Sequence, residues 1–325
     1  MPPSETRNTA MTAVPSYARR VAPPGGGWQR RLLNFVLRWS VQRMTPAHPD
    51  LARLRVKATA LDRRFARIDP AVHREAVDCA GVRAEWIEAP GARSERVILY
   101  LHGGAFILRF AAIHAAMLGP WCRGLNARAL MVDYRLAPEH PFPAAPDDCH
   151  AAYRWLLAQG CDPRSIVVAG DSAGGNLALV TLLRIKDAGE PLPACAILLS
   201  PVVDFTLCGP SLVENERHDP LFTLGGLLRL RTFYAPPERF LDPAVSPLFG
   251  DFRGLRPLLI QAGSTEMLRD EATRAAAKAH ASGVPVELEL WEGMPHVFQA
   301  MPMLPQAGAA TESILRFIRR HTGWR

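Results

Sequence analysis

Lysine is almost absent from this sequence of 325 residues. Lys57, Lys186 and Lys278 are its three lysines, so 35 of its 38 basic residues are arginine. The arginines are dispersed, and beyond the N-terminal region no run of them is interleaved with aromatic residues. The net charge of +7 therefore indicates a compositional bias more than a surface that binds nucleic acid, and we expect no nucleic-acid partner.

The cysteines lack the spacing of a metal site or a redox motif. There is no CxxC pair and no cluster of metal-ligand residue types around them. We expect buried or free thiols in a reducing compartment, which favours a cytoplasmic location. The six residues are Cys79, Cys122, Cys149, Cys161, Cys195 and Cys208.

Long apolar runs are also missing. No stretch is long enough to span a membrane, so we expect no integral membrane segment. Residues 1–27 are rich in Pro, Gly, Ser and Thr and hold no apolar run of the kind found in a secretory signal. We expect this N-terminal segment to be mobile.

Trp28 to Met44 is different, because apolar residues alternate there with arginines in the pattern of an amphipathic basic helix. Such a helix could make weak contact with a membrane surface. The alternative is a cap helix that lays its apolar face over the mouth of a site. We favour the cap, because packing is the usual fate of an apolar stripe.

The rest of the chain alternates between apolar strand-like runs and helical segments, which predicts an α/β fold with a mostly parallel sheet covered on both faces. We expect eight strands, the first two forming a hairpin that turns at Ala80-Gly81. The length suits one large domain with a small cap. The expected strands are 72–79, 82–89, 97–101, 129–134, 165–169, 194–199, 257–262 and 286–291, and the expected helices include 146–159, 173–187, 270–282 and 307–321.

One short motif carries the chemistry. Gly170-Asp171-Ser172-Ala173-Gly174 follows the apolar run 166–169 and opens into a helix-like segment. A G-x-S-x-G sequence between a strand and a helix is the nucleophile elbow, a tight turn that holds the serine hydroxyl clear of its neighbours. We therefore predict that Ser172 is a catalytic nucleophile.

A serine hydroxyl needs a general base, which in this arrangement follows it in the chain. Three histidines lie beyond the strand expected at 257–262. His280 ends an Ala-rich helical segment and His321 lies among arginines near the terminus, so both are typical of surface residues. His296 lies in the loop after the last expected strand, and we predict that it is the base.

An acid should precede the histidine and follow the strand 257–262. Glu266 comes first, in the turn at the carboxyl end of that strand, where ligand-facing groups gather in open α/β sheets. Asp270 and Glu271 come one turn later, where carboxylates stabilise the start of a helix. We predict that Glu266 is the acid and keep Asp270 as the alternative.

The last part is an oxyanion hole. The strand 97–101 runs into His102-Gly103-Gly104-Ala105, an H-G-G type of loop that brings backbone N–H groups close to a substrate. We predict that the oxyanion donors are Gly103, Gly104 and Ala173, and that His102 holds the loop by hydrogen bonding. No metal and no organic cofactor is required by this chemistry.

Seven motifs in the same order identify a family resemblance. They are His102-Gly103-Gly104-Ala105-Phe106, the run 133–145, Gly170-Asp171-Ser172-Ala173-Gly174-Gly175-Asn176, Leu199-Ser200-Pro201, Asp242-Pro243 with Ser246-Pro247, Leu268-Arg269-Asp270-Glu271, and the run 293–298. Together they resemble the bacterial hormone-sensitive lipase-like carboxylesterases, family IV of the α/β-hydrolases, from about Ala71 to the C-terminus.

The resemblance implies an α/β-hydrolase catalytic domain over 71–325 that hydrolyses small esters with short to medium acyl groups. It also implies a helical cap, built from N-terminal helices in 28–70 and an insertion at about 205–240. Family members often pair through the last strand and its helix, which makes a homodimer plausible. Two positions depart from the family pattern: Ala105 replaces a third glycine and adds a methyl group to the pocket wall, and Glu266 stands where an aspartate is common.

Other functions remain open at this stage. A lactone hydrolase or an acyltransferase would use the same residues, and a lipase acting at an oil interface is a weaker alternative. The motifs also resemble those of plant gibberellin receptors, which bind ligands on this scaffold without catalysis. Those receptors lack a working histidine, so the presence of His296 favours an enzyme.

Overall fold

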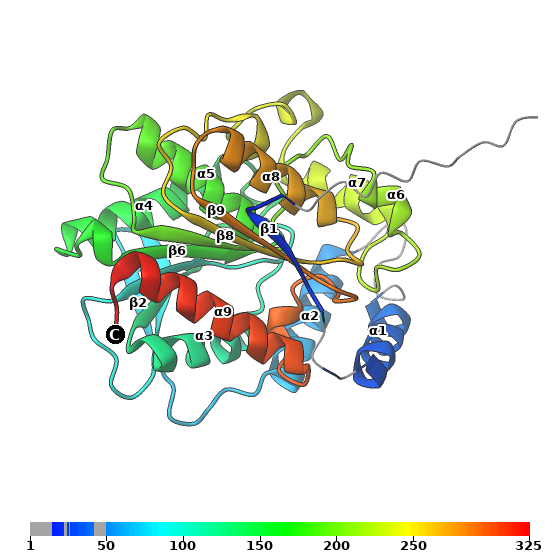
Figure 1. Ribbon diagram of the computed structural model, residues 1–325, viewed down its shortest axis with the longest axis horizontal. Coiled ribbons are helices and arrows are strands. Elements are labelled where there is room, and N and C mark those ends of the chain that lie inside the picture. Colours follow the sequence, from blue (N-terminus) through cyan, green and yellow to red (C-terminus); the bar gives the residue numbers. More distant parts are fainter. Residues whose placement is uncertain (1–14, 23–24, 26, 42–49) are drawn as a thin grey trace, which may run out of the picture.

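A computed structural model describes residues 15–22, 25, 27–41 and 50–325 of the chain. Its centre is a sheet of nine strands in the order β1-β9-β8-β7-β6-β4-β5-β3-β2 (Figure 1). The strands are β1 Ala18–Val21, β2 His73–Cys79, β3 Val82–Glu88, β4 Val97–Leu101, β5 Arg128–Val132, β6 Ile166–Asp171, β7 Cys195–Leu199, β8 Leu258–Gly263 and β9 Val286–Trp291.

All pairings in the sheet are parallel except those that β3 makes with β2 and with β5. Every residue of β4, β6 and β7 is buried, as expected for central parallel strands that are covered on both faces. The eight predicted strands are all present, and the α/β fold with a mostly parallel sheet is confirmed.

Helices cover both faces of this sheet. α3 and α9 lie on one face, and α4, α5 and α8 lie on the other, each layer with its own apolar core (Figure 1). The remaining helices, α1, α2, α6 and α7, lie at one end of the sheet. The helices are α1 Gly27–Val41, α2 Leu51–Phe65, α3 Ala111–Leu125, α4 Ala144–Ala158, α5 Ala173–Asp187, α6 Ser211–Glu214, α7 Leu224–Tyr234, α8 Arg269–Ala281 and α9 Pro305–Thr322.

The ninth strand corrects the prediction for the N-terminal segment. β1 pairs in parallel with β9, with Ala18 opposite Leu288 and Val21 opposite Trp291. The predicted number of eight strands is one too few, because the edge of β9 supplies partners for the backbone of β1. The segment 1–27, for which we predict mobility, therefore contains one strand in its described part. Residues 1–14 lie outside the described part of the chain.

β1 also changes the expectation of a dimer. It occupies the outer edge of β9, and Arg19 of β1 forms an ion pair with the buried Glu289 of β9. Direct pairing between the β9 strands of two copies is therefore excluded while β1 holds this place.

The amphipathic segment at 28–44 is helical as α1, and its last predicted residues, 42–44, lie outside the described part. Three of its described apolar side chains do not lie over the mouth of a site, because Trp28, Leu32 and Phe35 are 70%, 55% and 69% exposed. On its polar side, Arg38 donates to the backbone carbonyl of Asp219 at 3.3 Å. The role of α1 as a cap stays a prediction.

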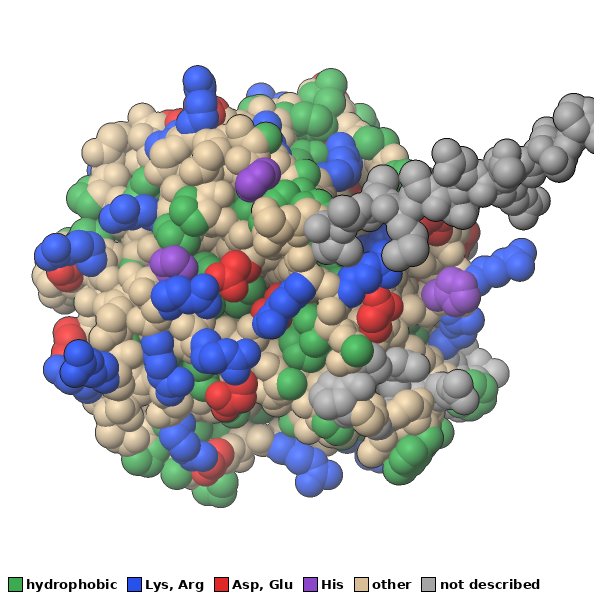
Figure 2. All heavy atoms as spheres, in the orientation of Figure 1, with side chains coloured by type: hydrophobic (Ala, Val, Ile, Leu, Met, Phe, Trp, Pro, Cys, Tyr) green, Lys and Arg blue, Asp and Glu red, His purple; other side chains and the backbone are tan. Residues whose placement is uncertain are grey.

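None of the helices in the described part of the chain is long and apolar enough to cross a bilayer. Figure 2 shows lysine and arginine side chains spread over one face of the molecule, with acidic side chains among them. That face offers no single basic patch of the kind that tracks a phosphate backbone.

Removing residues 1–22 is expected to make the protein self-associate. The deletion exposes the edge of β9, and an unpaired strand edge is a template for pairing with another chain. Size-exclusion chromatography with light scattering measures the effect. Deletion of residues 1–14, which keeps β1, is the matched control, and equal masses for the two truncated proteins would contradict the prediction.

Candidate active site

Ser172 lies in the turn between β6 and α5. Its backbone has φ 52° and ψ −116°, a conformation that residues with side chains rarely adopt. The turn needs glycine on both sides: an added methyl group at Gly170 would lie 2.2 Å from the carbonyl oxygen of Gly174, and one at Gly174 would lie 1.9 Å from that of Leu101. The serine N–H donates to the carbonyl of Leu199 at 2.8 Å and fixes the turn against β7.

His296 and Glu266 come from the loops that follow β9 and β8, and the structure brings them together. The imidazole Nδ1 lies 2.8 Å from Oε2 of the carboxylate, and both side chains are buried. The other carboxylate oxygen, Oε1, accepts hydrogen bonds from the Ser200 hydroxyl at 2.7 Å and from the Gly263 N–H. Glu266 is therefore fixed on both of its oxygens.

The surroundings of His296 favour its charged form. Burial works against the imidazolium, but the hydrogen bond and the charge of Glu266 outweigh it, with Asp219 and Asp171 adding to the effect, and the pKa of His296 is raised. The ring of Phe222 packs edge-on against the imidazole, with 4.8 Å between the ring centroids.

The second ring nitrogen of His296 faces no protein partner. Nε2 is buried and makes no hydrogen bond with any described residue, so it is not bonded to the hydroxyl of Ser172. Hydrogen bonds between a nucleophile and its base are often long until substrate is bound. The nitrogen that would take a proton is thus unoccupied by any other group of the described protein.

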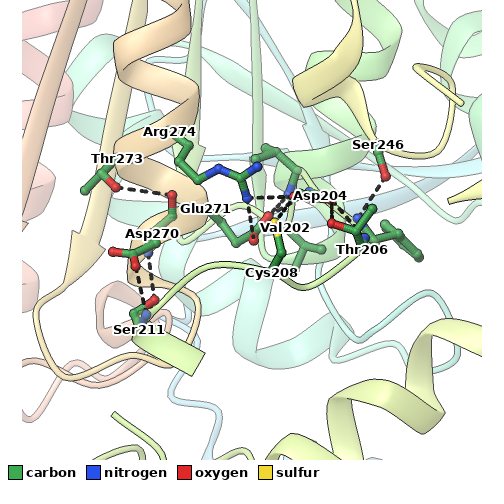
Figure 3. Close-up of polar contacts among 12 residues, drawn as sticks. Val202, Asp204, Thr206, Cys208, Ser211, Ser246, Asp270, Glu271, Thr273 and Arg274 are labelled. Atoms are coloured by element: carbon green, nitrogen blue, oxygen red, sulfur yellow. Dashed lines mark hydrogen bonds and ion pairs between the residues drawn. The ribbon is translucent and has the colours of Figure 1, made fainter. Parts of the chain in front are cut away.

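Asp270, the alternative acid, has other contacts. Its Oδ2 accepts from the Ser211 N–H at 2.8 Å (Figure 3). Its Oδ1 lies 3.0 Å from Nε of Arg269. Asp270 therefore ties α8 to α6, whereas the carboxylate on His296 is that of Glu266.

The oxyanion loop requires a correction. The N–H of Gly103 donates to the buried carboxylate of Asp171 at 2.8 Å, so the prediction that Gly103 supplies an oxyanion donor is wrong. In the described part of the chain, the N–H groups of Gly104 and Ala105 have no such acceptor. Ala105 and Ala173 also line the same pocket as Ser172.

A polar cluster that the sequence does not predict lies behind this loop. Asp171 Oδ1 accepts from the Tyr100 hydroxyl at 2.6 Å and lies 3.0 Å from Nε2 of His114 on α3. Burial opposes its ionisation, but His114 outweighs burial and the pKa of Asp171 is lowered to about 2. Asp171 could have been noticed because it lies within the G-x-S-x-G motif. No feature of the sequence points to His114.

His102 holds the loop, as predicted. Its Nδ1 lies 2.7 Å from the carbonyl oxygen of Gly103, and its ring stacks on Tyr134 with 4.2 Å between centroids. Burial lowers the pKa of His102 to about 3, so the ring is neutral and plays no acid–base part near neutral pH.

Ser172 opens into a small, mostly apolar pocket of about 50 Å³. A single water needs roughly 10–15 Å³ by this measure, so the pocket as it stands holds only a small group. Its far wall comes from α7 and the segments around it. The lining residues are Ala105, Phe106, Ser172, Ala173, Val202, Phe205, Leu207, Phe222, Leu227, Leu230, Arg231 and Leu268.

With this geometry in place, similarity to known proteins decides the family. A family model described as "alpha/beta hydrolase fold" matches residues 98–300. The chain belongs to the α/β-hydrolase family.

Its relatives narrow the family to a branch. The chain is 37% identical over 297 residues to an esterase of Acinetobacter venetianus, covering 90% of this chain and 97% of that one. It is 40% identical to an acetyl-hydrolase of Streptomyces hygroscopicus, covering 74% and 80%. Among solved structures, an esterase from the bacterial hormone-sensitive lipase family has 38% identity and a TM-score of 0.86, covering 92% of this chain and 99% of that one.

These similarities confirm the predicted resemblance: the protein is a carboxylic ester hydrolase of the hormone-sensitive lipase-like branch.

Within this α/β-hydrolase, the segment 202–208 supplies three pocket residues, and its backbone is held by side chains from the catalytic core. Oε2 of Glu271 on α8 accepts from the N–H groups of Val203 and Asp204 at 2.9 and 2.7 Å. Arg274, also on α8, pairs with the Asp204 carboxylate at 2.6 Å (Figure 3).

Glu271 is held in an uncommon state. Burial raises its pKa to about 8, with the charge of Asp204 adding to the rise and the two backbone N–H groups and Arg274 opposing it. Its protonated form is therefore favoured well above the usual pH range of a glutamate. On the same segment the exposed Cys208 lies with its Sγ 3.4 Å from the Asp204 carboxylate (Figure 3).

Glu271→Gln is expected to gain stability over the wild type as pH rises. The folded pKa of about 8 lies above the ordinary 4.5, so the contribution of Glu271 to stability is full below 4.5 and is lost as pH rises towards 8. Glutamine cannot ionise. The difference in Tm, measured from about pH 5 to about pH 9, should therefore grow in favour of the variant.

Asp270→Asn, which changes the neighbouring carboxylate, serves as the control. A Tm difference for Glu271→Gln that stays constant with pH would contradict the assignment.

Proposed function

We propose that the protein hydrolyses short to medium acyl esters through a Ser172–His296–Glu266 triad and an acyl-enzyme intermediate. The observation that carries the proposal is His296, which is oriented by Glu266 on one nitrogen and keeps the other free of protein partners. A base fixed in this way is what a serine nucleophile needs.

In this mechanism Nε2 of His296 takes the hydroxyl proton as Ser172 Oγ attacks the ester carbonyl. The C–O bond to the alcohol then breaks, and the alcohol leaves with the proton from His296. Water then attacks the carbonyl of the acyl-enzyme and gives its proton to His296. The bond between the acyl carbon and Ser172 Oγ breaks, the proton passes from His296 to Oγ, and the carboxylic acid leaves. Glu266 holds the imidazole in one tautomer and stabilises its cationic form.

The oxyanion that forms in each step is held by backbone N–H groups. We assign this role to Gly104, Ala105 and Ala173, because Asp171 occupies the N–H of Gly103. Ala173 is the first residue of α5, where an N–H has no partner within the helix. A donor of this kind is typically worth about 2.7–4 kcal/mol of barrier.

Two observations support a small acyl group. The pocket beside Ser172 is about 50 Å³, and the methyl group of Ala105 forms part of its wall. Among the similar proteins, one is named an acetyl-hydrolase, and crystals of the esterase EstE5, 38% identical with a TM-score of 0.86, were soaked with p-nitrophenyl butyrate. A lactone or a second alcohol acceptor would use the same residues, so lactone hydrolysis and acyl transfer are alternative outcomes.

We also propose a cytoplasmic location and weak contact with a membrane surface. All six cysteines are free, which suits a reducing compartment and supports a cytoplasmic location. The exposed apolar side chains Trp28, Leu32 and Phe35 of α1 support weak contact with a membrane surface.

We propose the helices in 28–70 and the insertion at about 205–240 as the cap over the catalytic domain 71–325, with α7 as the part nearest the pocket.

Ser172→Ala is expected to lower kcat for p-nitrophenyl butyrate by at least about 10⁴-fold, because the alanine has no group to attack the carbonyl. A fluorophosphonate probe should label the wild type and leave the variant unlabelled. In a chain-length series, acetyl to butyryl esters should be preferred over long acyl esters. Wild-type turnover in the alanine variant would overturn the nucleophile, and lack of labelling in the wild type would favour a non-catalytic binding protein.

Activity should fall as pH drops through a value above 6.5, because His296 must be neutral to act as base and its pKa is raised. Glu266→Gln removes the charge that raises this pKa, so the acidic limb of kcat/KM should move to lower pH. The same change should reduce kcat by about 10³–10⁴-fold, as the loss of the orienting acid does in other triads. Asp270→Asn is the matched control, and a larger loss in that variant would shift the acid role to Asp270.

A further inference from the structure

The pocket beside Ser172 contains one charged side chain. Of its twelve lining residues ten are nonpolar, and the other two are Ser172 and Arg231. Arg231 follows Leu227 by one helical turn on α7 and is next to Leu230, so it lies on the pocket-facing side of that helix. A guanidinium in an apolar site is costly unless a polar partner meets it.

Arg231 is held in place by its surroundings. One of its nitrogens, Nη1, donates to the backbone carbonyls of Phe205 and Thr206, the latter at 3.1 Å. The guanidinium carbon lies 4.4 Å from the centroid of the Phe240 ring. These contacts fix the direction of the planar group, and the described residues provide no acceptor for its other two nitrogens.

No carboxylate of the described residues lies within ion-pair distance of Arg231, and its Nε is buried without a hydrogen-bond partner. The acidic group that acts on it is Asp204, whose own carboxylate is engaged by Arg274 at 2.6 Å and by Thr206. Burial lowers the pKa of Arg231, and the charge of Asp204 opposes that shift.

We propose that Arg231 binds an anionic oxygen of the substrate, so that the natural substrate is an ester with a carboxylate on its acyl or its alcohol part. The inference rests on the proposed function, because the ester bond is taken to be cleaved at Ser172. A carboxylate oxygen would accept a charge-assisted hydrogen bond from Nη2, because Nη1 is engaged by backbone carbonyls and Nε is buried. The net charge of +7 would also attract such a substrate.

A purely structural role is the alternative. Arg231 would then serve only to hold the 205–206 backbone, and its loss would affect charged and neutral substrates alike. The two roles are separated by comparing esters of equal length that differ in one carboxylate.

The experiment measures kcat/KM for two matched pairs, monoethyl succinate against ethyl butyrate for the acyl side, and 3-acetoxypropanoate against propyl acetate for the alcohol side. In the wild type, one pair should favour the carboxylate. Arg231→Met should lower that charged-to-neutral ratio at least about tenfold, equivalent to about 1.4 kcal/mol. Arg229→Met, on the same helix but outside the pocket lining, is the control and should leave the ratio unchanged.

A second measurement does not depend on turnover. Ser172→Ala should bind the favoured carboxylate ester at least about tenfold more tightly than its neutral match by isothermal titration, and Ser172→Ala with Arg231→Met should lose this preference. Loss of turnover on all four esters with the preference intact would overturn the esterase mechanism alone. Ratios and affinities that are unchanged by Arg231→Met, for both pairs, would overturn the role of Arg231.

Discussion

The carboxylate of Asp171 is the point on which the geometry of the site depends. It immediately precedes Ser172 in the chain, yet it points back into the protein and accepts the N–H of Gly103. One buried charge therefore connects the nucleophile turn to the oxyanion loop, and Tyr100 and His114 keep that charge solvated inside the core. An isolated carboxylate would be very costly there, so these partners are a condition for the site and not an addition to it.

Buried carboxyl groups that accept backbone N–H groups also occur elsewhere around the pocket. These carboxyl groups accept N–H groups from the backbone at or beyond the ends of strands: Glu266 from Gly263, the last residue of β8, and Glu271 from the 203–204 segment after β7. Asp219 accepts from Leu221 and two other backbone N–H groups in the same way. Loops at the carboxyl ends of the strands are thus shaped by side chains as much as by their own sequence. This allows the sheet to stay regular while the wall of the pocket takes an irregular path.

The parts of the site that follow chain order could be predicted from the sequence. Ser172, Glu266 and His296 each lie in the turn or loop that follows a strand, and the structure places the last two within hydrogen-bond distance. The donor role of Gly103 could not be judged, because the pattern H-G-G does not reveal which N–H is already bonded to Asp171. The strands could also be predicted from local sequence, because a buried parallel strand appears as a continuous run of apolar residues.

The errors concern contacts between distant segments. β1 has only four residues with two arginines, and nothing local indicates that the edge of β9 completes it. The apolar stripe of α1 can be recognised in the sequence. The stripe does not specify which of its side chains the neighbouring segments cover. His114 likewise has a role only because α3 brings it beside Asp171. Local pattern defines the elements, and tertiary contact defines their function.

Cys208 gives this arrangement a practical consequence. Of the six cysteines it alone is exposed, and it follows Leu207 of the pocket wall on the segment that Glu271 and Arg274 hold. A thiol-reactive fluorophore would therefore attach selectively at the rim of the pocket without any engineered residue. A label on the native Cys208 would thus report spectroscopically on the entry of a ligand into the pocket.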